Sequence, residues 1–233
     1  MLDERLSLVF DLYPACRLAA DIGTDHAHLP AALLQRGRCQ HMLLTDISPA
    51  ALENARGEIS RRGLTDRVTL RLGDGLEPVS EPCEAISVTG MGGRTIRDML
   101  LDGRERLRGA MLILSAHTDW PLIREAVMEI GYTIDREEPC FAAGRFYLVL
   151  RATPGREALS DRELRLGKRL FQSRSPRLKP FLRRRREILL RELKGLRAAS
   201  RPDPLREETL LSDLAFYDAE LRKITSQETE ADP

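Results

Sequence analysis

Residues 21–30, Asp-Ile-Gly-Thr-Asp-His-Ala-His-Leu-Pro, contain the side chains of this chain that are best suited to binding a ligand. They follow a short apolar run at 16–20 and precede a helix-like segment at 31–36. Gly23 lets the backbone turn sharply and approach a ligand closely, because it has no Cβ. A helix that starts here also leaves N–H groups free to bind. The stretch therefore predicts a ligand-binding turn between a strand and a helix.

Asp25 indicates which ligand suits this turn. The dinucleotide-binding pattern G-x-G-x-x-G would place its second glycine at this position. A carboxylate repels a pyrophosphate but attracts a cation, such as the sulfonium and amino-acid end of S-adenosylmethionine (SAM). The sequence also has no G-x-x-x-x-G-K-[ST] motif, which argues against a P-loop NTPase.

Three more polar motifs follow predicted strands. They are Thr45-Asp46-Ile47-Ser48, Gly73-Asp74-Gly75-Leu76 and Gly90-Met91-Gly92-Gly93. In an open α/β sheet, ligands bind beyond the carboxyl ends of the strands. Asp46 suits the two ribose hydroxyls of a nucleoside, and Asp74 suits the adenine amino group. One such aspartate alone is more often a helix cap or turn former, but the four motifs together favour a nucleoside-containing cofactor, and their acidic groups favour SAM over NAD or ATP.

Apolar runs alternate with helical periodicity and predict the elements that position these motifs. We expect strands at 17–22, 41–46, 68–72, 85–89 and 110–115, with helices at 27–35, 49–61, 94–101 and 120–130, after an opening helix that ends before Pro14. Segments 132–138 and 145–151 are joined by too few residues for a crossover helix, so they form an antiparallel hairpin. The pattern predicts an α/β fold, a doubly wound sheet with a terminal antiparallel hairpin, as in class I SAM methyltransferases.

The C-terminal third lacks strand-like segments. A linker at 153–156 is followed by a predicted short helix at 161–171. Leucines from Leu178 to Leu196 and apolar residues from Leu210 to Ile224 recur at helical spacing, with a proline-containing connection at 200–205. They predict two antiparallel helices in a coiled-coil-like hairpin. We therefore expect a SAM-binding domain at 1–153 and a basic helical domain for RNA binding at 154–233.

Charge is distributed unevenly along the chain. Residues 151–200 carry 16 Arg and Lys against 5 Asp and Glu, net +11, whereas 1–150 and 201–233 are each net −5. The basic segment predicts a polyanionic partner such as RNA, and the alternative is a solvated helical face in an arginine-rich chain. The candidate phosphate contacts are Arg174, Arg177, Lys179, Arg183, Arg184, Arg185, Arg186 and Arg191.

Composition limits the remaining possibilities. The chain has 233 residues, of which 42% are hydrophobic, and its net charge is +1, as expected for a globular α/β domain with a smaller second unit. No apolar run approaches the roughly 20 residues that span a bilayer, and the N-terminus lacks a secretory signal pattern. We expect a cytoplasmic protein with no membrane partner. The four cysteines are far apart in sequence, which predicts buried free thiols and no metal site.

Three segments resemble the TrmK-type bacterial tRNA (adenine-22 N1) methyltransferases. They are Ala20-Asp-Ile-Gly-Thr-Asp-His-Ala-His-Leu-Pro30, Arg71-Leu-Gly-Asp-Gly-Leu76 and Thr89-Gly-Met-Gly-Gly93. The resemblance covers nearly the whole chain and implies a class I SAM fold, a coiled-coil-like C-terminal domain and a tRNA substrate. By matched motif positions it implies that the cofactor contacts Asp21, Gly23, Asp46, Asp74, Gly75 and residues 90–93. Ile47, beside Asp46, is a further candidate for cofactor binding. It also implies that Asp25 faces the site of methyl transfer.

Several interpretations of the substrate site stay open at this point. His26, His28 and His117 are candidates for the base pocket, but each can equally be a cap or a packed polar group. Family members often have tyrosine in place of His28 and Leu-Gln-Pro-Asn in place of 114–117. The alternative functions are a SAM methyltransferase acting on another RNA or a small molecule, and an RNA-binding module without catalysis. We expect a monomer, with a dimer through the C-terminal helices as the alternative.

Overall fold

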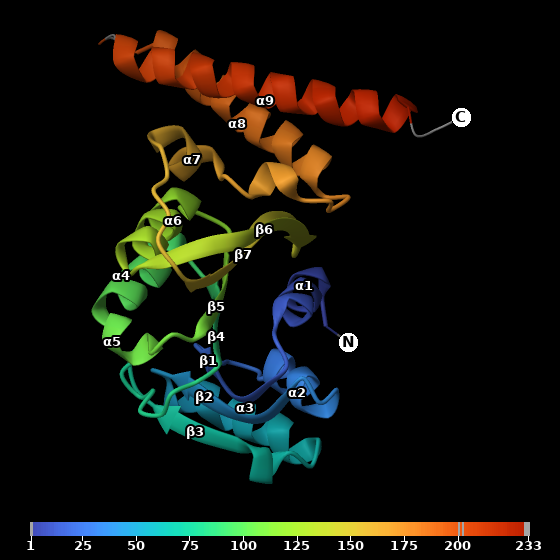
Figure 1. Ribbon diagram of the computed structural model, residues 1–233, viewed down its shortest axis with the longest axis vertical. Coiled ribbons are helices and arrows are strands. Elements are labelled where there is room, and N and C mark those ends of the chain that lie inside the picture. The colour runs from blue at the N-terminus through green and yellow to red at the C-terminus, as the bar shows by residue number, and fades with distance from the viewer. Residues whose placement is uncertain (1, 200, 202, 231–233) are drawn as a thin grey trace.

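A seven-stranded sheet forms the centre of the protein (Figure 1). The computed structural model describes residues 2–199, 201 and 203–230, so the predicted connection at 200–205 is only partly described. The strand order is β3-β2-β1-β4-β5-β7-β6. The pairs among β1 to β5 are parallel, whereas β7 pairs antiparallel with both β5 and β6. The predicted doubly wound sheet with a terminal antiparallel hairpin is confirmed.

The strands and helices follow one another in the alternating order that the periodicity predicts. The strands are β1 (Cys16–Ile22), β2 (Cys39–Asp46), β3 (Val68–Leu72), β4 (Ala85–Met91), β5 (Met111–Ala116), β6 (Tyr132–Ala142) and β7 (Arg145–Pro154). The helices are α1 (Glu4–Leu12), α2 (His28–Gln35), α3 (Pro49–Arg61), α4 (Gly93–Asp102), α5 (Arg104–Leu107), α6 (Trp120–Glu129), α7 (Asp161–Leu166), α8 (Leu178–Arg197) and α9 (Pro204–Glu230), with 3-10 turns at Thr65–Arg67 and Leu170–Gln172.

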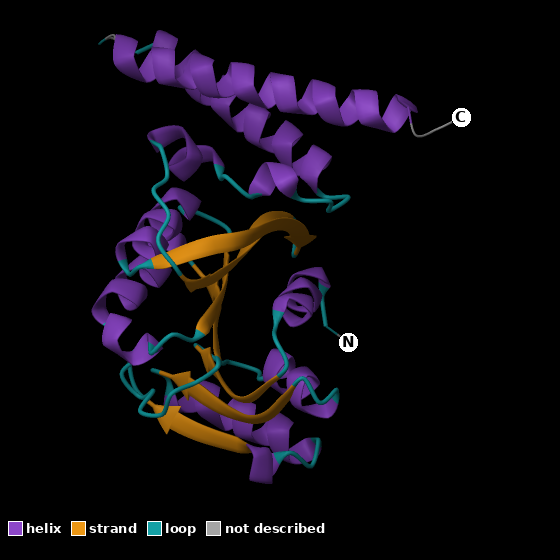
Figure 2. Ribbon diagram, viewed as in Figure 1, coloured by secondary structure: helices purple, strands orange, loops and turns teal. Residues whose placement is uncertain are grey.

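Helices cover both faces of the sheet (Figure 2). Buried residues of α4, α5 and α6, such as Ile96, Leu107 and Ile123, belong to one hydrophobic cluster. Buried residues of α1 and α2, such as Phe10 and Leu33, belong to a second cluster on the other face. Strands buried on both sides are typical of parallel sheets and explain their almost continuous apolar runs. This arrangement brings the carboxyl ends of β1, β2, β3 and β4 to one edge.

The structure corrects two predicted segments. The hairpin turn is much tighter than residues 139–144, because β6 continues to Ala142 and β7 begins at Arg145. The predicted helix at 161–171 ends at Leu166 and is followed by a separate 3-10 turn. Gly167 interrupts it with a φ of +90°, and a Cβ there would lie 2.7 Å from Nη2 of Arg124. A glycine with positive φ is a common end of a helix, and the apolar periodicity that continues past it did not show the break.

The C-terminal helices form the predicted hairpin and pack on the rest of the chain (Figure 1). Phe181 of α8 is buried against Trp120 of α6, with ring centroids 5.4 Å apart. Leu170, Leu182 and Tyr217 belong to the same hydrophobic cluster as α4 and α6. The helical unit therefore shares a core with the sheet.

Candidate functional site

The turn after β1 is held by the neighbouring strand. The backbone N–H groups of Gly23 and Thr24 both donate to the carbonyl oxygen of Thr45, at 2.8 and 3.0 Å. Gly23 has a φ of +74°, and a Cβ on it would overlap the Met91 methyl at the end of β4. The positive φ therefore favours glycine here, and any larger residue would also displace the Met91 methyl. The β1 and β4 motifs that the sequence analysis singled out are in direct contact.

Asp21 is a buried carboxylate at the end of β1. The residue is only 5% exposed, and its Oδ1 accepts a hydrogen bond from the Ser87 hydroxyl of β4. Tyr13 in turn donates to the Ser87 oxygen at 2.8 Å. Burial raises the pKa of Asp21 to about 6, and the Ser87 hydrogen bond opposes that rise. A cationic ligand at this carboxylate would offset part of its desolvation cost.

Asp25 lies in the turn between β1 and α2 with a half-exposed side chain. Its Oδ2 is 3.1 Å from Nε2 of His26, and its Oδ1 accepts a 3.4 Å hydrogen bond from Asn54 of α3. His26 stacks on His28, with ring centroids 5.7 Å apart. His28 lies 3.4 Å from Glu58, so it also has a structural partner on α3. The predicted group of Asp25, His26 and His28 is therefore brought together.

These side chains line a cavity of about 390 Å³ at the sheet edge. Asp21, Gly23 and Gly90 contribute to its wall along with Asp25, His26 and His28. Arg5 of α1 also lines it, and its Nη1 is buried without a hydrogen-bond partner in the described part of the chain. Arg5 and Ser87 belong to no sequence motif, and only the tertiary structure brings them to Asp21.

Asp46 at the end of β2 and Asp74 just after β3 lie at the same edge of the sheet. The Asp46 carboxylate accepts a 2.8 Å hydrogen bond from the backbone of Ser48, which caps α3. Ile47 beside it is 67% exposed, an unusual position for a large apolar side chain and one that suits contact with a planar ring. Asp46 thus has the turn-forming role that was the alternative interpretation of this residue. The exposed Ile47 side chain beside it is accessible to a ligand.

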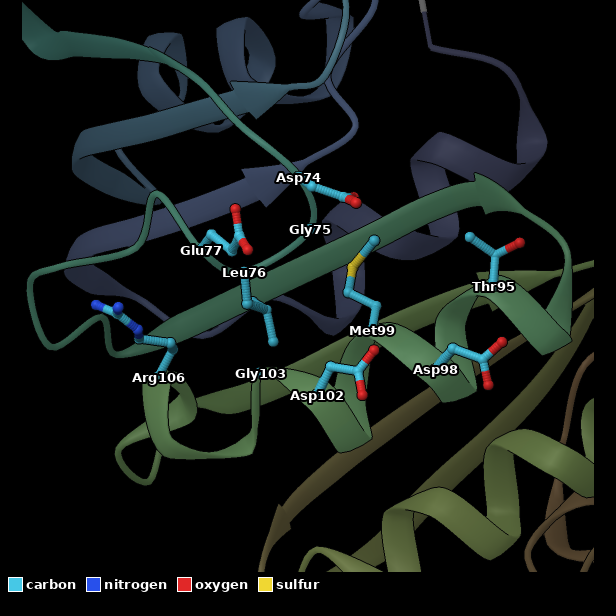
Figure 3. Close-up of a pocket in the computed structure, with 10 residues that line it drawn as sticks. All are labelled: Asp74, Gly75, Leu76, Glu77, Thr95, Asp98, Met99, Asp102, Gly103 and Arg106. Atoms are coloured by element: carbon cyan, nitrogen blue, oxygen red, sulfur yellow. The ribbon is translucent and has the colours of Figure 1, made fainter.

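Asp74 and Gly75 line a second cavity, of about 450 Å³, which faces α4 (Figure 3). Met99 extends from α4 toward this turn, and a Cβ on Gly75 would lie 3.0 Å from its Cγ. Asp98 and Asp102 of α4 also contribute to the wall. Asp74 and Gly75 therefore line a different cavity from Asp21, Gly23 and Gly90.

The glycines at the end of β4 and the start of α4 have different roles. Gly90 has a φ of +84°, which favours glycine, and Gly92 is the N-cap residue of α4. A Cβ on Gly93 would lie 2.5 Å from the Thr118 carbonyl oxygen and 2.6 Å from that of Asp119. Packing of α4 against the β5–α6 loop therefore accounts for Gly93 without any ligand.

His117 does not join the other two histidines. It lines a third cavity with Trp120 and residues of the hairpin and α8. Its ring lies against Tyr147, with centroids 5.7 Å apart. The three predicted base-pocket histidines therefore do not form one site, because His26 and His28 line one cavity and His117 lines another.

Most residues of the basic segment have intramolecular partners. Arg177 forms a bidentate ion pair with Glu4, and Arg186 pairs with Asp218 of α9. Arg184 and Arg191 both pair with Glu187, Arg185 lies over the Trp120 ring, and Lys179 also has a partner. Among the described residues, no ion pair involves Arg174 or Arg183. Many of these basic side chains therefore also stabilise the position of α8 through contacts within the protein.

The donor set at the sheet edge fits SAM. The buried carboxylate of Asp21 suits its cationic end, the glycine turn allows close approach, and Asp46, Ile47 and Asp74 offer acceptors and an apolar surface for a nucleoside. Within the described part of the chain, no group of three His, Cys, Asp or Glu side chains is arranged to hold a metal ion. All four cysteines are buried and free, as predicted. No helix within the described ranges is long and apolar enough to cross a membrane.

Comparisons with known proteins give the chain a family context. A family model described as a methyltransferase domain matches residues 2–150. The tRNA (adenine(22)-N(1))-methyltransferase of Bacillus subtilis is 32% identical over 163 residues, covering 69% of this chain and 68% of the relative.

Solved structures extend the similarity to the C-terminal helices. A Streptococcus pneumoniae protein assigned to the tRNA (m1A22) methyltransferases superposes with a TM-score of 0.85 at 25% identity, covering 95% of this chain and 100% of that one. The same protein in complex with SAM superposes with a TM-score of 0.82 at 25% identity, over the same shares of both chains. The m1A22 tRNA methyltransferase TrmK of B. subtilis, at 23% identity and a TM-score of 0.82, shows the same fold over 95% of this chain and 99% of that one.

Proposed function

The chain belongs to the tRNA (adenine(22)-N(1))-methyltransferase family, and we propose that it transfers a methyl group from SAM to N1 of adenine 22 in tRNA. One observation carries the proposal: the carboxylates of Asp21, Asp46 and Asp74 lie at or just beyond the carboxyl ends of three adjacent strands of the methyltransferase sheet. They match the cation, the ribose and the adenine of SAM in order along the edge.

Within this proposal, residues 1–153 bind the cofactor and the target base. Asp21, Gly23, Gly90 and Met91 hold the amino-acid end, while Asp46, Ile47, Asp74 and Gly75 hold the nucleoside. Bound SAM supplies a methyl group on a sulfonium, which is already activated toward displacement. Adenine N1 has its own lone pair, so the chain needs no covalent nucleophile, and orientation of the base is its main contribution.

Asp25 is our candidate catalytic residue. Its half-exposed carboxylate lines the same cavity as Asp21 and is steadied by Asn54. There it accepts a hydrogen bond from the adenine N6 amino group and stabilises the positive charge that develops on the ring. His26 and His28 shape the pocket around the base.

The RNA is bound by the basic helical unit at 154–233 in this proposal. Arg174 and Arg183 are the strongest candidates for phosphate contacts, because both are exposed and neither is engaged in an ion pair with a described residue. An adenine inside folded RNA has to leave its stack to reach the sheet edge. Since tRNA is the substrate, we place the protein in the cytoplasm.

Asp25→Ala tests the catalytic assignment. The full chain is incubated with labelled SAM and unmodified bulk tRNA, and the digested nucleosides are identified. We expect wild-type protein to produce N1-methyladenosine, and the variant to lose about 100-fold or more of the rate, the typical contribution of a positioned acid–base group. SAM affinity should stay within a few-fold.

Asp66→Ala is the matched control, since Asp66 is exposed at the opposite end of the sheet, before β3. It should leave the rate unchanged. Normal turnover in Asp25→Ala would remove Asp25 from the mechanism. Labelling of another RNA, with tRNA untouched, would favour the alternative substrate class, and absence of SAM binding would favour a binding module.

A further inference from the structure

The third cavity, of about 330 Å³, lies where the β6–β7 hairpin, the start of α6 and helix α8 meet. Its size is within the range of small-ligand sites. Its wall combines aromatic rings with cationic side chains. The lining residues are His117, Trp120, Phe141, Gly144, Arg145, Phe146, Phe181, Arg184, Arg185 and Ile188.

The aromatic side chains form one continuous wall. Phe141 and Phe146 meet with ring centroids 5.0 Å apart, and Phe146 meets Phe181 at 5.6 Å. Phe181 continues the contact to Trp120 at 5.4 Å. Three of these rings are anchored in the core, whereas Phe141 at the hairpin tip is 39% exposed. An exposed ring beside anchored rings offers a face on which a planar group can stack.

The rim of this cavity is positively charged. Arg145, Arg184 and Arg185 contribute guanidinium groups from two elements, and the described lining residues include no acidic side chain. The two cavities at the carboxyl ends of the strands are each lined by several aspartates, so this cavity differs from both in charge. Aromatic faces with arginines around them suit a base and its phosphate, because each ring stacks and each guanidinium pairs with the backbone.

We propose that this aromatic cavity binds an unstacked base of the tRNA other than the methylated adenine. The inference rests on the proposed function, because tRNA is the substrate there. The cavity shares no residue with the one lined by Asp25, so the two bind different nucleotides. Arg5 and Tyr147 link them: the Arg5 guanidinium lies 5.3 Å over the Tyr147 ring, which contacts His117. One RNA strand can therefore place its target at Asp25 and another base against Phe141.

Trp120 makes this cavity directly observable, because it is the single tryptophan of the chain and lies in the cavity wall. The full-length protein is titrated with a six-nucleotide single-stranded RNA, and in parallel with inorganic phosphate at equal ionic strength. We expect the RNA to quench Trp120 emission and phosphate to leave it unchanged. Equal changes of Trp120 emission with RNA and with phosphate would mean that the cavity binds phosphate and no base, which would overturn the proposal.

Phe141 variants test the role of the ring in binding tRNA. Phe141→Ala and Phe141→Leu should raise the Kd for tRNA at least about fivefold, while Phe141→Tyr should stay within twofold of wild type. Leu211→Ala trims another exposed apolar side chain, on α9, and should have no effect. SAM affinity should be unchanged in all four variants, and each should keep a cooperative thermal unfolding transition.

The outcomes separate this inference from the proposed function. Wild-type methylation of tRNA together with an unaltered tRNA Kd in Phe141→Ala would overturn the base site and leave the function intact. Wild-type protein that binds tRNA through Phe141 but methylates no tRNA would overturn the function and leave the base site intact. Trp120 emission that does not respond to RNA, together with an unaltered tRNA Kd in the Phe141 variants, would likewise overturn the base site.

Discussion

Asp21 differs from most aspartates in that its carboxylate is buried at a candidate binding site. Its carboxylate is buried, and the Ser87 hydroxyl compensates it only in part. The charged form is therefore held at a cost to the fold, a common feature of functional sites. A cationic ligand would stabilise the charged carboxylate, which burial disfavours.

The raised pKa of Asp21 predicts an unusual pH dependence of stability. Its pKa is about 6 in the folded chain and near its ordinary value of 3.8 in the unfolded chain, so the folded state binds more protons between these values. The contribution of Asp21 to the unfolding free energy therefore falls as pH rises from about 4 to 6, by about 3 kcal/mol. Asp21→Asn should remove this fall and be more stable than wild type above pH 6.

Urea unfolding of both proteins at several pH values between 4 and 7.5 measures the effect. The difference between variant and wild type should grow with pH through this window and then level off. Asp66→Asn, at an exposed site, should show a constant difference. A constant difference in Asp21→Asn would mean that Asp21 does not titrate in this range.

At the scale of elements, one buried ion pair joins the helical unit to the sheet. Nε of Arg124 on α6 lies 2.6 Å from Oε1 of Glu137 on β6, and both side chains are almost fully buried. Arg124 also donates to the Leu164 carbonyl oxygen, while the other Glu137 oxygen accepts from the backbone N–H groups of Arg169 and Leu170. The pair therefore positions α7 and the following 3-10 turn, and through them the start of α8.

Glu137→Gln should destabilise the protein strongly. Removing one partner leaves the Arg124 charge buried and uncompensated, which typically costs about 3–5 kcal/mol. Glu187→Gln, in an exposed pair with Arg184, should cost no more than about 1 kcal/mol. Denaturant unfolding at neutral pH compares the two; equal effects would show that the buried pair adds nothing to the attachment of the helices.

At the scale of the whole molecule, part of the positive charge of residues 151–200 is neutralised by ion pairs within the protein. The acidic α9 packs along the basic α8, where Arg186 pairs with Asp218 and Arg197 pairs with Glu207. The net charge of the segment therefore overstates the charge available to RNA. Unpaired arginines are the better guide to the binding face.

Arg183→Ala should weaken tRNA binding without changing stability. Each phosphate contact releases counterions, so loss of one should reduce the slope of log Kd against log salt by about 1. Arg104→Ala, on α5 in an exposed pair with Glu105, is the control and should keep the wild-type slope. A tRNA affinity that is independent of salt in wild-type protein would contradict a phosphate-binding role for the basic segment.

The sequence alone determined the order of strands and helices, the terminal hairpin and the acidic motifs at the strand ends, because periodicity and turn residues act over short stretches of chain. The tertiary structure decided what depends on residues far apart in sequence. Burial raises the pKa of Asp21, the Arg124–Glu137 pair packs beside Gly167 where α7 ends, and α9 neutralises part of α8. It also separated His117 from His26 and placed it in an aromatic cavity, since the hairpin and α8 meet there only after the chain has folded.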